Sequence, residues 1–535
     1  MQLQRSIDGW TRMLVALSVA IMAGCASGDG DEAAPAEIGS DSHALYVASG
    51  KVWSSATIPV CWEGTGFAQE RAWAEAALRD SWEGVSSVRF TGFGACTSGR
   101  RGLRMRMQNA GGFTTGLGRD LDGVVNGVNL NSWGTAAAPT ACATGFSRED
   151  CVRSTAVHEL GHALGFAHEQ NRPDTPAACT QPAQGTSGNT TVGGFDWDSV
   201  MNYCNTVRNG RGILSWTDIV GVTRFYGTGG RWTDARLFDA SFYLSLYPDL
   251  RAAFGNDTTA ARIHWLAYGL PREGRRASRA FDVSFYLALY PDLRAAFGTR
   301  YADALHHFVV QGLPNEGRRG SRELDVRFYE NVYPDIQNAF GYNFTAALDH
   351  FIYQGLPHEG RRGSREFDVR AYENIYPDIQ NAFGASYQAA FDHWVVQGLP
   401  NEGRRGSREF DVRFYKAYYA DLQAAFGANH QAALDHWIIQ GLPNEGRRGS
   451  REVDVRYYKS YYGDLQAAFG NDHQAALDHW IIQGLPNEGR RSSSAFDVSF
   501  YVNYYGDLHA AFGNNFSAAF DHWLRYGIGE GRRGI

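Results

Sequence analysis

The sequence predicts two unlike parts, an α+β domain followed by an all-α array of repeats. Six cysteines follow Cys25 and all of them lie before residue 230, whereas the rest of the chain has none. Residues 238–535 repeat with a constant period of 43 residues, which is typical of stacked helical units. A chain of 535 residues is also too long for a single core. We place the boundary at the glycine-rich segment 227–230.

The first 25 residues predict an export signal. A stretch with two arginines precedes an apolar run over residues 13–24, which is too short to span a bilayer. The run ends in Met-Ala-Gly-Cys, which resembles the lipobox of bacterial lipoproteins. That resemblance implies a lipid anchor on Cys25, as the sole contact with a membrane, and a location at the cell surface or outer membrane. An ordinary signal peptide, giving a secreted protein, is the alternative. Residues 26–44, rich in small and acidic residues, predict a flexible linker.

Residues 45–228 predict an α+β domain with a twisted sheet. The segment AQERAWAEAALRDSW over residues 68–82 places Ala and Trp at helical spacing, and SVRFTGF and LRMRM follow it as strand-like segments. The segment GVVNGVNLN over residues 123–131 predicts a further strand. We place that strand at an edge of the sheet, where a peptide substrate could pair with it.

The six cysteines of this domain predict disulfides in an exported protein. Their number is even and none of them has CxxC spacing, which favours disulfides over a metal site. Fifteen pairings are possible. We favour pairing of nearest neighbours, which joins Cys61 to Cys96, Cys142 to Cys151, and Cys179 to Cys204.

A predicted helix over residues 148–164 carries the first candidate metal ligands. Ser147 and Asp150 suit a capped helix start, and an apolar stripe along the segment predicts a buried face. His158 and His162 are four residues apart and therefore lie on one side of the helix, about one turn apart. Both imidazoles can then bind one Zn²⁺ ion.

Three further residues indicate a catalytic rather than a structural zinc site. Gly165 ends the helix, so that His168 can turn back as the third ligand and leave an open coordination position for water. Glu159 follows the first ligand and is suited to hold that water, take its proton and pass it to the leaving amine. The sequence therefore predicts a zinc-bound water activated by Glu159.

The zinc segment and a second motif resemble one family of metallopeptidases. The segment HELGHALGFAHEQNRPD, which starts at His158, is similar to the pattern HExxHxxGFxHExxRxD of the astacins within the metzincin clan, and SVMNY over residues 199–203 resembles their Met-turn. The resemblance covers roughly residues 45–228 and implies a metzincin-like catalytic domain with one zinc ion that cleaves protein or peptide substrates. It further implies that Met201 lies beneath the zinc and that Tyr203 is a switchable fifth ligand that stabilises the oxyanion.

Glu169, which follows the third histidine, is not expected to have the N-terminal partner that the equivalent glutamate has in astacins. In astacins this glutamate pairs with the freed N-terminus of the mature enzyme. An acylated Cys25 at the end of a linker could not supply that terminus. The resemblance therefore leaves the role of Glu169 open.

Seven repeats occupy residues 238–535, each close to FDVxFYxxxYPDLxAAFGxxxxAALDHWxxxGLPxEGRR. Asp at the start suits a helix N-cap, Gly suits the end of the last helix, and the alanine-rich segments favour helices over propeller strands. One histidine in each unit, such as His350, suits a helix-face side chain satisfied by a neighbouring unit. A column of metal ligands is the less favoured alternative. The Glu-Gly-Arg-Arg ending predicts a solvated, ion-paired turn.

The formal net charge of −7 excludes a nucleic-acid-binding surface and a generally basic membrane-binding surface. Two functions remain. The first is an exported zinc-dependent metalloendopeptidase, with the repeats as a targeting or binding array for a ligand in the cell envelope or matrix. The alternative is a surface adhesion or binding repeat protein with an inactive protease remnant. The intact set of His158, Glu159, His162 and His168 favours the peptidase.

Overall fold

The computed structural model describes residues 45–535. The predicted signal peptide at 1–25, with Cys25, and the linker at 26–44 lie outside the described residues. The described chain forms two compact units, residues 45–309 and 310–535. The first unit holds the cysteine-bearing segment together with repeat 1 and most of repeat 2. No helix of residues 45–535 is long and apolar enough to cross a membrane.

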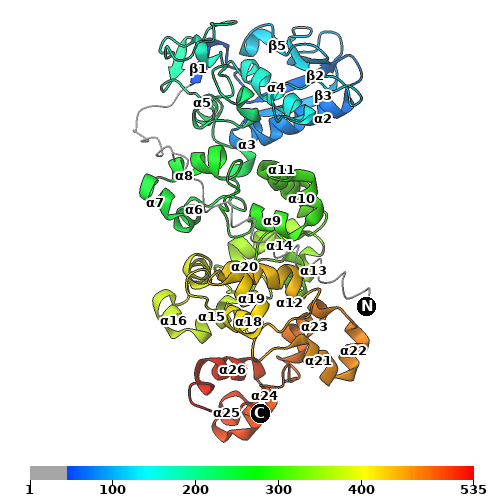
Figure 1. The fold of residues 1–535 in the computed structure, drawn as a ribbon, viewed down its shortest axis with the longest axis vertical. Coiled ribbons are helices and arrows are strands. Elements are labelled where there is room, and N and C mark those ends of the chain that lie inside the picture. The colour runs from blue at the N-terminus through cyan, green and yellow to red at the C-terminus, as the bar shows by residue number, and fades with distance from the viewer. Residues whose placement is uncertain (1–44) are drawn as a thin grey trace. The chain divides into compact units, whose positions relative to one another are not determined.

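A five-stranded sheet in the order β3-β2-β4-β6-β5 forms the framework of the N-terminal domain (Figure 1). Four strands are parallel and β5 is antiparallel to β6. The strands are β2 (Thr57–Glu63), β3 (Arg89–Ala95), β4 (Leu103–Gln108), β5 (Phe113–Thr114) and β6 (Val128–Asn131). The prediction that residues 123–131 form an edge strand is wrong in one respect, because β5 pairs with the outer side of β6 and takes the edge.

Two helices of the domain begin with reciprocal side-chain caps, and the first of them starts where Ser147 and Asp150 predict. Ser147 at the start of α4 (Arg148–Ala163) and Ser215 at the start of α5 (Trp216–Tyr226) each form a reciprocal capping box with an Asp three residues later. The helix predicted over residues 68–82 is α2 (Ala68–Asp80), which a short α3 (Trp82–Val85) follows. Trp82 is fully buried and its indole N–H donates to the Val157 carbonyl at 2.9 Å, which fixes α3 against α4.

The remaining elements of the N-terminal domain are short. β1 (Leu45–Val47) and β7 (Thr190–Val192) form a separate antiparallel pair. Five 3₁₀ turns cover Ser49–Lys51, Gly118–Leu121, Glu169–Asn171, Arg208–Gly212 and Arg231–Thr233.

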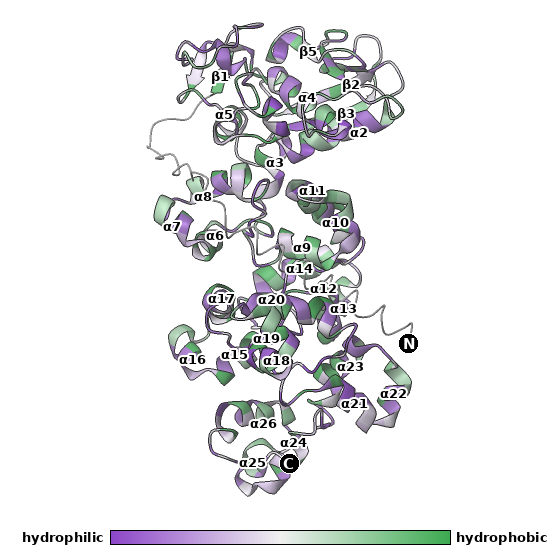
Figure 2. Ribbon diagram, in the orientation of Figure 1, coloured by the Kyte–Doolittle hydropathy of each residue, from purple (hydrophilic) through white to green (hydrophobic). Residues whose placement is uncertain are grey.

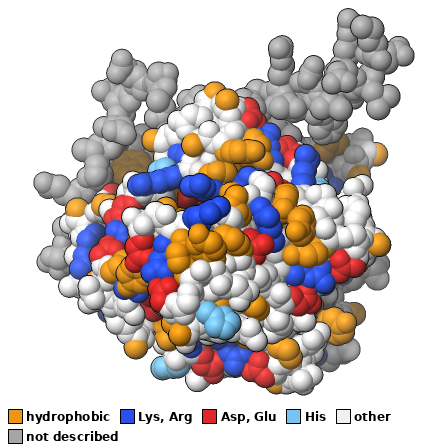
Figure 3. Space-filling model, turned by 90° about the horizontal axis from the view of Figure 1, so that it is seen from below, with side chains coloured by type: hydrophobic (Ala, Val, Ile, Leu, Met, Phe, Trp, Pro, Cys, Tyr) orange, Lys and Arg blue, Asp and Glu red, His pale blue; other side chains and the backbone are white. Residues whose placement is uncertain are grey.

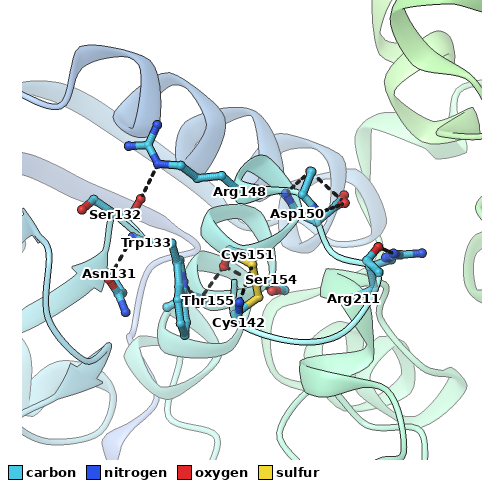
Figure 4. Close-up of a disulfide and its surroundings, with 12 residues drawn as sticks. Asn131, Ser132, Trp133, Cys142, Arg148, Asp150, Cys151, Ser154, Thr155 and Arg211 are labelled. Carbon is cyan, nitrogen blue, oxygen red and sulfur yellow. Dashed lines mark hydrogen bonds between the residues drawn. A yellow bond between two sulfur atoms is a disulfide. The ribbon is translucent and has the colours of Figure 1, made fainter. Parts of the chain in front are cut away.

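The three disulfides join nearest neighbours along the chain, as predicted: Cys61–Cys96, Cys142–Cys151 and Cys179–Cys204. The second lies at the start of α4 (Figure 4). Beside it, the Arg148 guanidinium donates to the Ser132 carbonyl at 3.0 Å, and the Trp133 indole donates to the Thr155 hydroxyl at 3.1 Å (Figure 4). The segment that follows β6 is thereby fixed along the helix that carries the candidate ligands.

Each of the seven repeats consists of three short helices, as the composition of the repeats predicts. An Asp caps the first helix in every repeat, for example Asp239, whose carboxylate accepts from the Phe242 amide at 3.0 Å. The third helix continues into a π-helical turn, such as Trp265–Gly269. Hydrophilic and hydrophobic residues alternate along these helices (Figure 2), and the buried ones form the core of each repeat.

The helices of the repeats are as follows. Repeat 1 has α6 (Ala240–Leu246), α7 (Pro248–Phe254) and α8 (Thr258–His264); repeat 2 has α9 (Val283–Leu289), α10 (Pro291–Phe297) and α11 (Tyr301–His307). Repeat 3 has α12 (Val326–Val332), α13 (Pro334–Phe340) and α14 (Phe344–His350); repeat 4 has α15 (Val369–Ile375), α16 (Pro377–Phe383) and α17 (Tyr387–His393). Repeat 5 has α18 (Val412–Tyr418), α19 (Ala420–Phe426) and α20 (His430–His436); repeat 6 has α21 (Val455–Tyr461), α22 (Gly463–Phe469) and α23 (His473–His479); repeat 7 has α24 (Val498–Tyr504), α25 (Gly506–Phe512) and α26 (Phe516–His522).

The histidine of each repeat has a partner in its own repeat rather than in a neighbouring one. In repeat 3, for example, the Tyr329 hydroxyl lies 2.8 Å from Nδ1 of His350. The same pair recurs in the other six repeats at 2.9 to 3.0 Å. The prediction that each helix-face histidine has a partner is therefore confirmed. The prediction that this partner belongs to a neighbouring repeat is wrong.

The arginines of the repeat endings are only partly solvated. The first arginine of the pair forms surface ion pairs, as Arg361 does with Asp335 at 2.7 Å. The second arginine of the pair is buried. Arg362, for example, pairs with Glu409 at the end of the next repeat at 3.2 Å. A third arginine, Arg365, reaches Asp478 of repeat 6 at 2.6 Å. These buried pairs connect the repeats. The prediction of ion-paired turns is confirmed, but the prediction that they are solvated is wrong for the second and third arginines.

Candidate metal centre and active site

Three histidines converge on one point in the N-terminal domain. His158 and His162 lie one turn apart on α4, and Gly165, with φ of 99°, ends the helix and returns the chain so that His168 faces them. Nε2 of His168 is 3.3 Å from Nε2 of His158 and 3.1 Å from Nε2 of His162. Ligand atoms of all three lie within 4.8 Å of one another. The structure therefore brings together the three ligands that the sequence predicts.

The outer nitrogen of each imidazole is held by a backbone carbonyl. Nδ1 of His158 lies 2.7 Å from the Val200 oxygen, Nδ1 of His162 lies 2.7 Å from the Phe166 oxygen, and Nδ1 of His168 lies 2.9 Å from the Gln184 oxygen. Because a carbonyl only accepts, Nδ1 carries the proton in each ring and the Nε2 lone pair faces inward.

Burial keeps the imidazoles neutral, which is the form that binds a metal. It lowers the pKa of His158 to about 3 and the pKa of His162 well below its ordinary value. Three neutral Nε2 donors at this spacing, with their outer nitrogens fixed, fit the ligand set of catalytic zinc.

Glu159 follows His158 on α4, and one of its carboxylate oxygens has no partner among the described residues. The residue is 5 % exposed, and its Oε2 has no hydrogen bond among the described residues. Burial raises its pKa to about 8. Gly112, next to β5, packs on it so closely that an added Cβ would lie 3.1 Å from Oε1 and 2.6 Å from the Thr155 methyl. The edge strand thus runs directly beside this carboxylate.

Tyr203 and Met201 reach the centre from the turn that follows β7. The Tyr203 ring stacks on His158 at 5.3 Å between centroids and lies 4.4 Å from His168. Its side chain is partly exposed, whereas Met201 is fully buried. A Cβ added at Gly161 of α4 would lie 2.4 Å from the Met201 sulfur, so the glycine lets this methionine pack directly against the helix.

The matching family identifies the domain. Residues 47–180 match the model of the Astacin peptidase family, and this range includes Glu159 and all three histidines. The N-terminal domain is an astacin-type zinc metallopeptidase. The chain matches none of the curated proteins.

Several solved structures are similar to the astacin-type domain. Two structures of myroilysin are 19% and 18% identical, with TM-scores of 0.25 and 0.23; each covers 34% of this chain, and the matches cover 97% and 88% of those chains. High choriolytic enzyme 1, a hatching enzyme zinc-protease from Oryzias latipes (medaka fish), is 22% identical with a TM-score of 0.24, and the match covers 34% of this chain and 96% of that one.

A buried carboxylate at the start of α5 supports the metal centre. Asp218 accepts from the Ser199 hydroxyl at 2.7 Å and from the Val200 amide at 2.9 Å. The same Val200 supplies the carbonyl that orients His158. Burial raises the pKa of Asp218 to about 7. The cap of α5 therefore also positions a ligand.

Glu169 has a partner within the astacin-type domain. Its carboxylate lies 3.3 Å from Arg172 and accepts from the Asp196 amide at 3.0 Å, and both Glu169 and Arg172 side chains are fully buried. The 3₁₀ turn Glu169–Asn171 follows His168 directly, so this pair holds the chain that carries the third ligand. The other oxygen of Glu169, Oε2, has no hydrogen-bond partner among the described residues.

The outer face of α4 is joined to repeat 2 by buried charges within the first compact unit. Arg153 donates to Asp80 of α2 at 2.7 Å and to Asp303 of α11 at 2.6 Å. His306 of α11 lies 2.7 Å from the same Asp80. The catalytic helix is thus braced by the peptidase's own α2 and by a helix of the repeats.

Proposed function

We propose that the chain is an exported enzyme that cleaves internal peptide bonds of protein substrates, and that its repeats are a targeting or binding array. The observation that carries the catalytic part is the convergence of three inward-facing Nε2 atoms, together with a buried oxygen of Glu159, the neighbour of His158 on α4, that has no partner among the described residues. Astacin-type metallopeptidase activity accounts for both features, because the first suits zinc and the second suits proton transfer.

Each residue of the site has a separate role in this proposal. His158, His162 and His168 hold zinc, which when bound would polarise the substrate carbonyl and favour the ionised form of Glu159. Glu159 takes a proton from the attacking water and gives it to the leaving amine. The Tyr203 hydroxyl donates to the substrate carbonyl oxygen as negative charge develops there.

Three disulfides support an exported location, because they form and persist in oxidising compartments. The lipobox-like segment ending at Cys25 supports anchoring at a bacterial cell surface or outer membrane by acylation of that cysteine. Secretion without an anchor gives the same disulfides. Mass spectrometry of the mature N-terminus separates the two, because a lipid on Cys25 adds the mass of its acyl chains.

Metal dependence tests the proposed activity. The purified full chain should cleave casein, a zinc chelator should remove at least about 99% of that cleavage, and added zinc should restore it, since three neutral imidazoles bind zinc reversibly. Cleavage that survives full removal of the metal would contradict the proposal. A chain that binds zinc but cleaves nothing would favour the alternative of an adhesion protein with an inactive front domain.

A further inference from the structure

The last three repeats differ from the first four at one surface position. Repeats 5, 6 and 7 place a tyrosine at the end of their first helix, namely Tyr418, Tyr461 and Tyr504, and these side chains are 56, 55 and 51 % exposed. The equivalent residues of repeats 1 to 4 are aliphatic: Leu246, Leu289, Val332 and Ile375. Exposed aromatic side chains recurring at one position indicate an interaction surface.

Each of these tyrosines is one member of a stacked pair of rings. Tyr418 stacks on Phe414 with centroids 5.2 Å apart and an interplanar angle of 21°. Tyr461 stacks on Tyr457 at 5.3 Å and 20°, and the pair in repeat 7 has the same arrangement at 5.0 Å and 25°. The partner ring fixes each tyrosine. A guanidinium also lies over two of the rings, Arg448 5.8 Å from the Tyr418 centroid and Arg491 6.0 Å from the Tyr461 centroid. The part of each ring that stays exposed is therefore an ordered aromatic surface with a donor beside it.

Polar groups surround two of the platforms and form pockets. A pocket of about 440 Å³ is lined by Tyr461, Tyr462, Arg490, Arg491 and Asp497 with the adjoining loop. The equivalent pocket of the preceding repeat has a volume of about 540 Å³ and contains Tyr418, Tyr419, Arg447, Arg448 and Asp454. On the face drawn in Figure 3, side chains of the hydrophobic class, which includes tyrosine there, lie next to basic side chains in several places.

The pocket beside Tyr418 contains a carboxylate, Asp454, that lacks the arginine partner of its equivalents in earlier repeats. Asp239 pairs with Arg279 at 2.6 Å, and Asp325 pairs with Arg365 at 3.0 Å. Ser494 stands where the corresponding arginine of Asp454 would be, and Asp454 forms no ion pair among the described residues. Oδ1 of Asp454 caps a helix, which leaves Oδ2 as an acceptor in the pocket.

The charges of the pockets disfavour an anionic ligand. Arg491 donates to the Ser493 and Ser494 carbonyls at 2.7 and 2.9 Å, so part of its guanidinium is already used. Asp497 and Glu488 line the same pocket and offset the positive charge. The groups that remain available to a ligand are the exposed tyrosine ring and the hydrogen-bond donors and acceptors around it.

From this combination we propose that repeats 5 to 7 bind a neutral polysaccharide built of uncharged pyranose sugars. A pyranose ring has an apolar C–H face that fits the tyrosine, and its hydroxyls can donate to a carboxylate and accept from a guanidinium. Repeat 7 has the same ring pair, with Arg533 5.5 Å from the Tyr504 ring. Equivalent sites on one chain bind a repeating polymer jointly, which multiplies weak affinities. The proposal rests on the proposed role of the repeats as a binding array and names its ligand.

The test compares binding and catalysis in the same full-length, zinc-loaded chain. Its probes are gels that contain a soluble β-glucan, xylan or galactomannan, and pellets of cellulose and chitin. We expect at least one of these neutral polysaccharides to retard or pellet the wild-type chain. The triple variant Tyr418→Leu/Tyr461→Leu/Tyr504→Leu should bind that probe at least about tenfold more weakly, because all three platforms are lost together. Aliphatic residues occupy these positions in repeats 1 to 4, so the fold tolerates them.

The matched control is Tyr342→Leu, which removes an 84 % exposed tyrosine outside both pockets and should leave binding unchanged. Absence of binding to every neutral probe, equal binding by the triple variant, or preference for heparin or a proline-rich peptide would overturn the proposal. Cleavage of a short peptide by the triple variant should equal that of the wild type. A wild-type chain that does not cleave the peptide would instead overturn the proposed function. Failure of the polysaccharide proposal and failure of the proposed function are therefore distinguishable.

Discussion

The variant Glu159→Gln should lower kcat/KM for a peptide substrate by about 10²–10⁴-fold, the range expected when a proton-transfer group is removed. Glutamine has nearly the same shape but accepts no proton at neutral pH, so the pocket beside Gly112 remains filled. The three histidine ligands are untouched, and the zinc content of the variant should equal that of the wild type. Steady-state kinetics on a fluorogenic peptide, together with metal analysis of the same sample, measures both quantities.

A substitution of the same kind far from the site provides the control for this result. Glu530→Gln changes an exposed glutamate of repeat 7, which pairs with Arg532, and should leave kcat/KM unchanged. Full activity in Glu159→Gln would show that another group takes the proton. A variant that also loses its zinc would indicate that Glu159 has a structural role.

The variant Arg153→Met should destabilise the catalytic unit by about 3–5 kcal/mol, as removal of one member of a buried ion pair does. Asp80 and Asp303 would then face each other without the guanidinium between them, and their side chains are only 7 and 10 % exposed. The full chain contains two compact units, so an activity readout isolates the relevant one. The temperature at which half of the peptide cleavage survives a fixed heating period should fall by roughly 5–10 °C.

The double variant Arg153→Met/Asp303→Ala separates repulsion from lost packing. It removes one of the two facing carboxylates and leaves Asp80 with His306, so part of the lost heat resistance should return. An equal or larger loss in the double variant, or no loss in Arg153→Met, would contradict the assigned network.

Three residues of repeat 2 that deviate from the other repeats indicate this network in the sequence. Repeat 2 alone carries Arg300, Asp303 and His306 at positions where every other repeat has a short polar residue, an alanine, and an aspartate or isoleucine. Asp303 and His306 lie on α11 and Arg300 directly precedes it. All three contact the peptidase domain, Arg300 through Glu149 at 2.7 Å. A deviation of three residues at spacing i, i+3, i+6 marks one helix face, but the sequence alone does not say what that face contacts.

Local features of the site were predictable because their causes are local. A serine and an aspartate three residues apart define the start of α4, a glycine with positive φ ends it, and histidines four apart share a face. Short spacings also favoured the nearest-neighbour disulfides. The support of the ligands was not predictable in this way, because Val200, Phe166 and Gln184 contribute backbone carbonyls, which any residue has.

Errors in the sequence analysis arose where the outcome depends on tertiary packing. The edge strand β5 has only two residues, Phe113 and Thr114, too few for a pattern, so residues 123–131 took its place in the prediction. The arginines of the repeat endings looked solvated because they alternate with acidic residues. Stacking buries Arg362 and Arg405 against glutamates 47 residues further along the chain, a separation that no local pattern contains.

Metal analysis of the purified full chain tests the central claim most directly. The wild type should contain about one zinc ion per chain, and His162→Ala should contain almost none while keeping the circular dichroism of the wild type. His350→Ala, which changes a repeat histidine paired with Tyr329, should keep its zinc. A folded wild type without zinc, or equal zinc in His162→Ala, would contradict the assignment of His158, His162 and His168 as the metal centre.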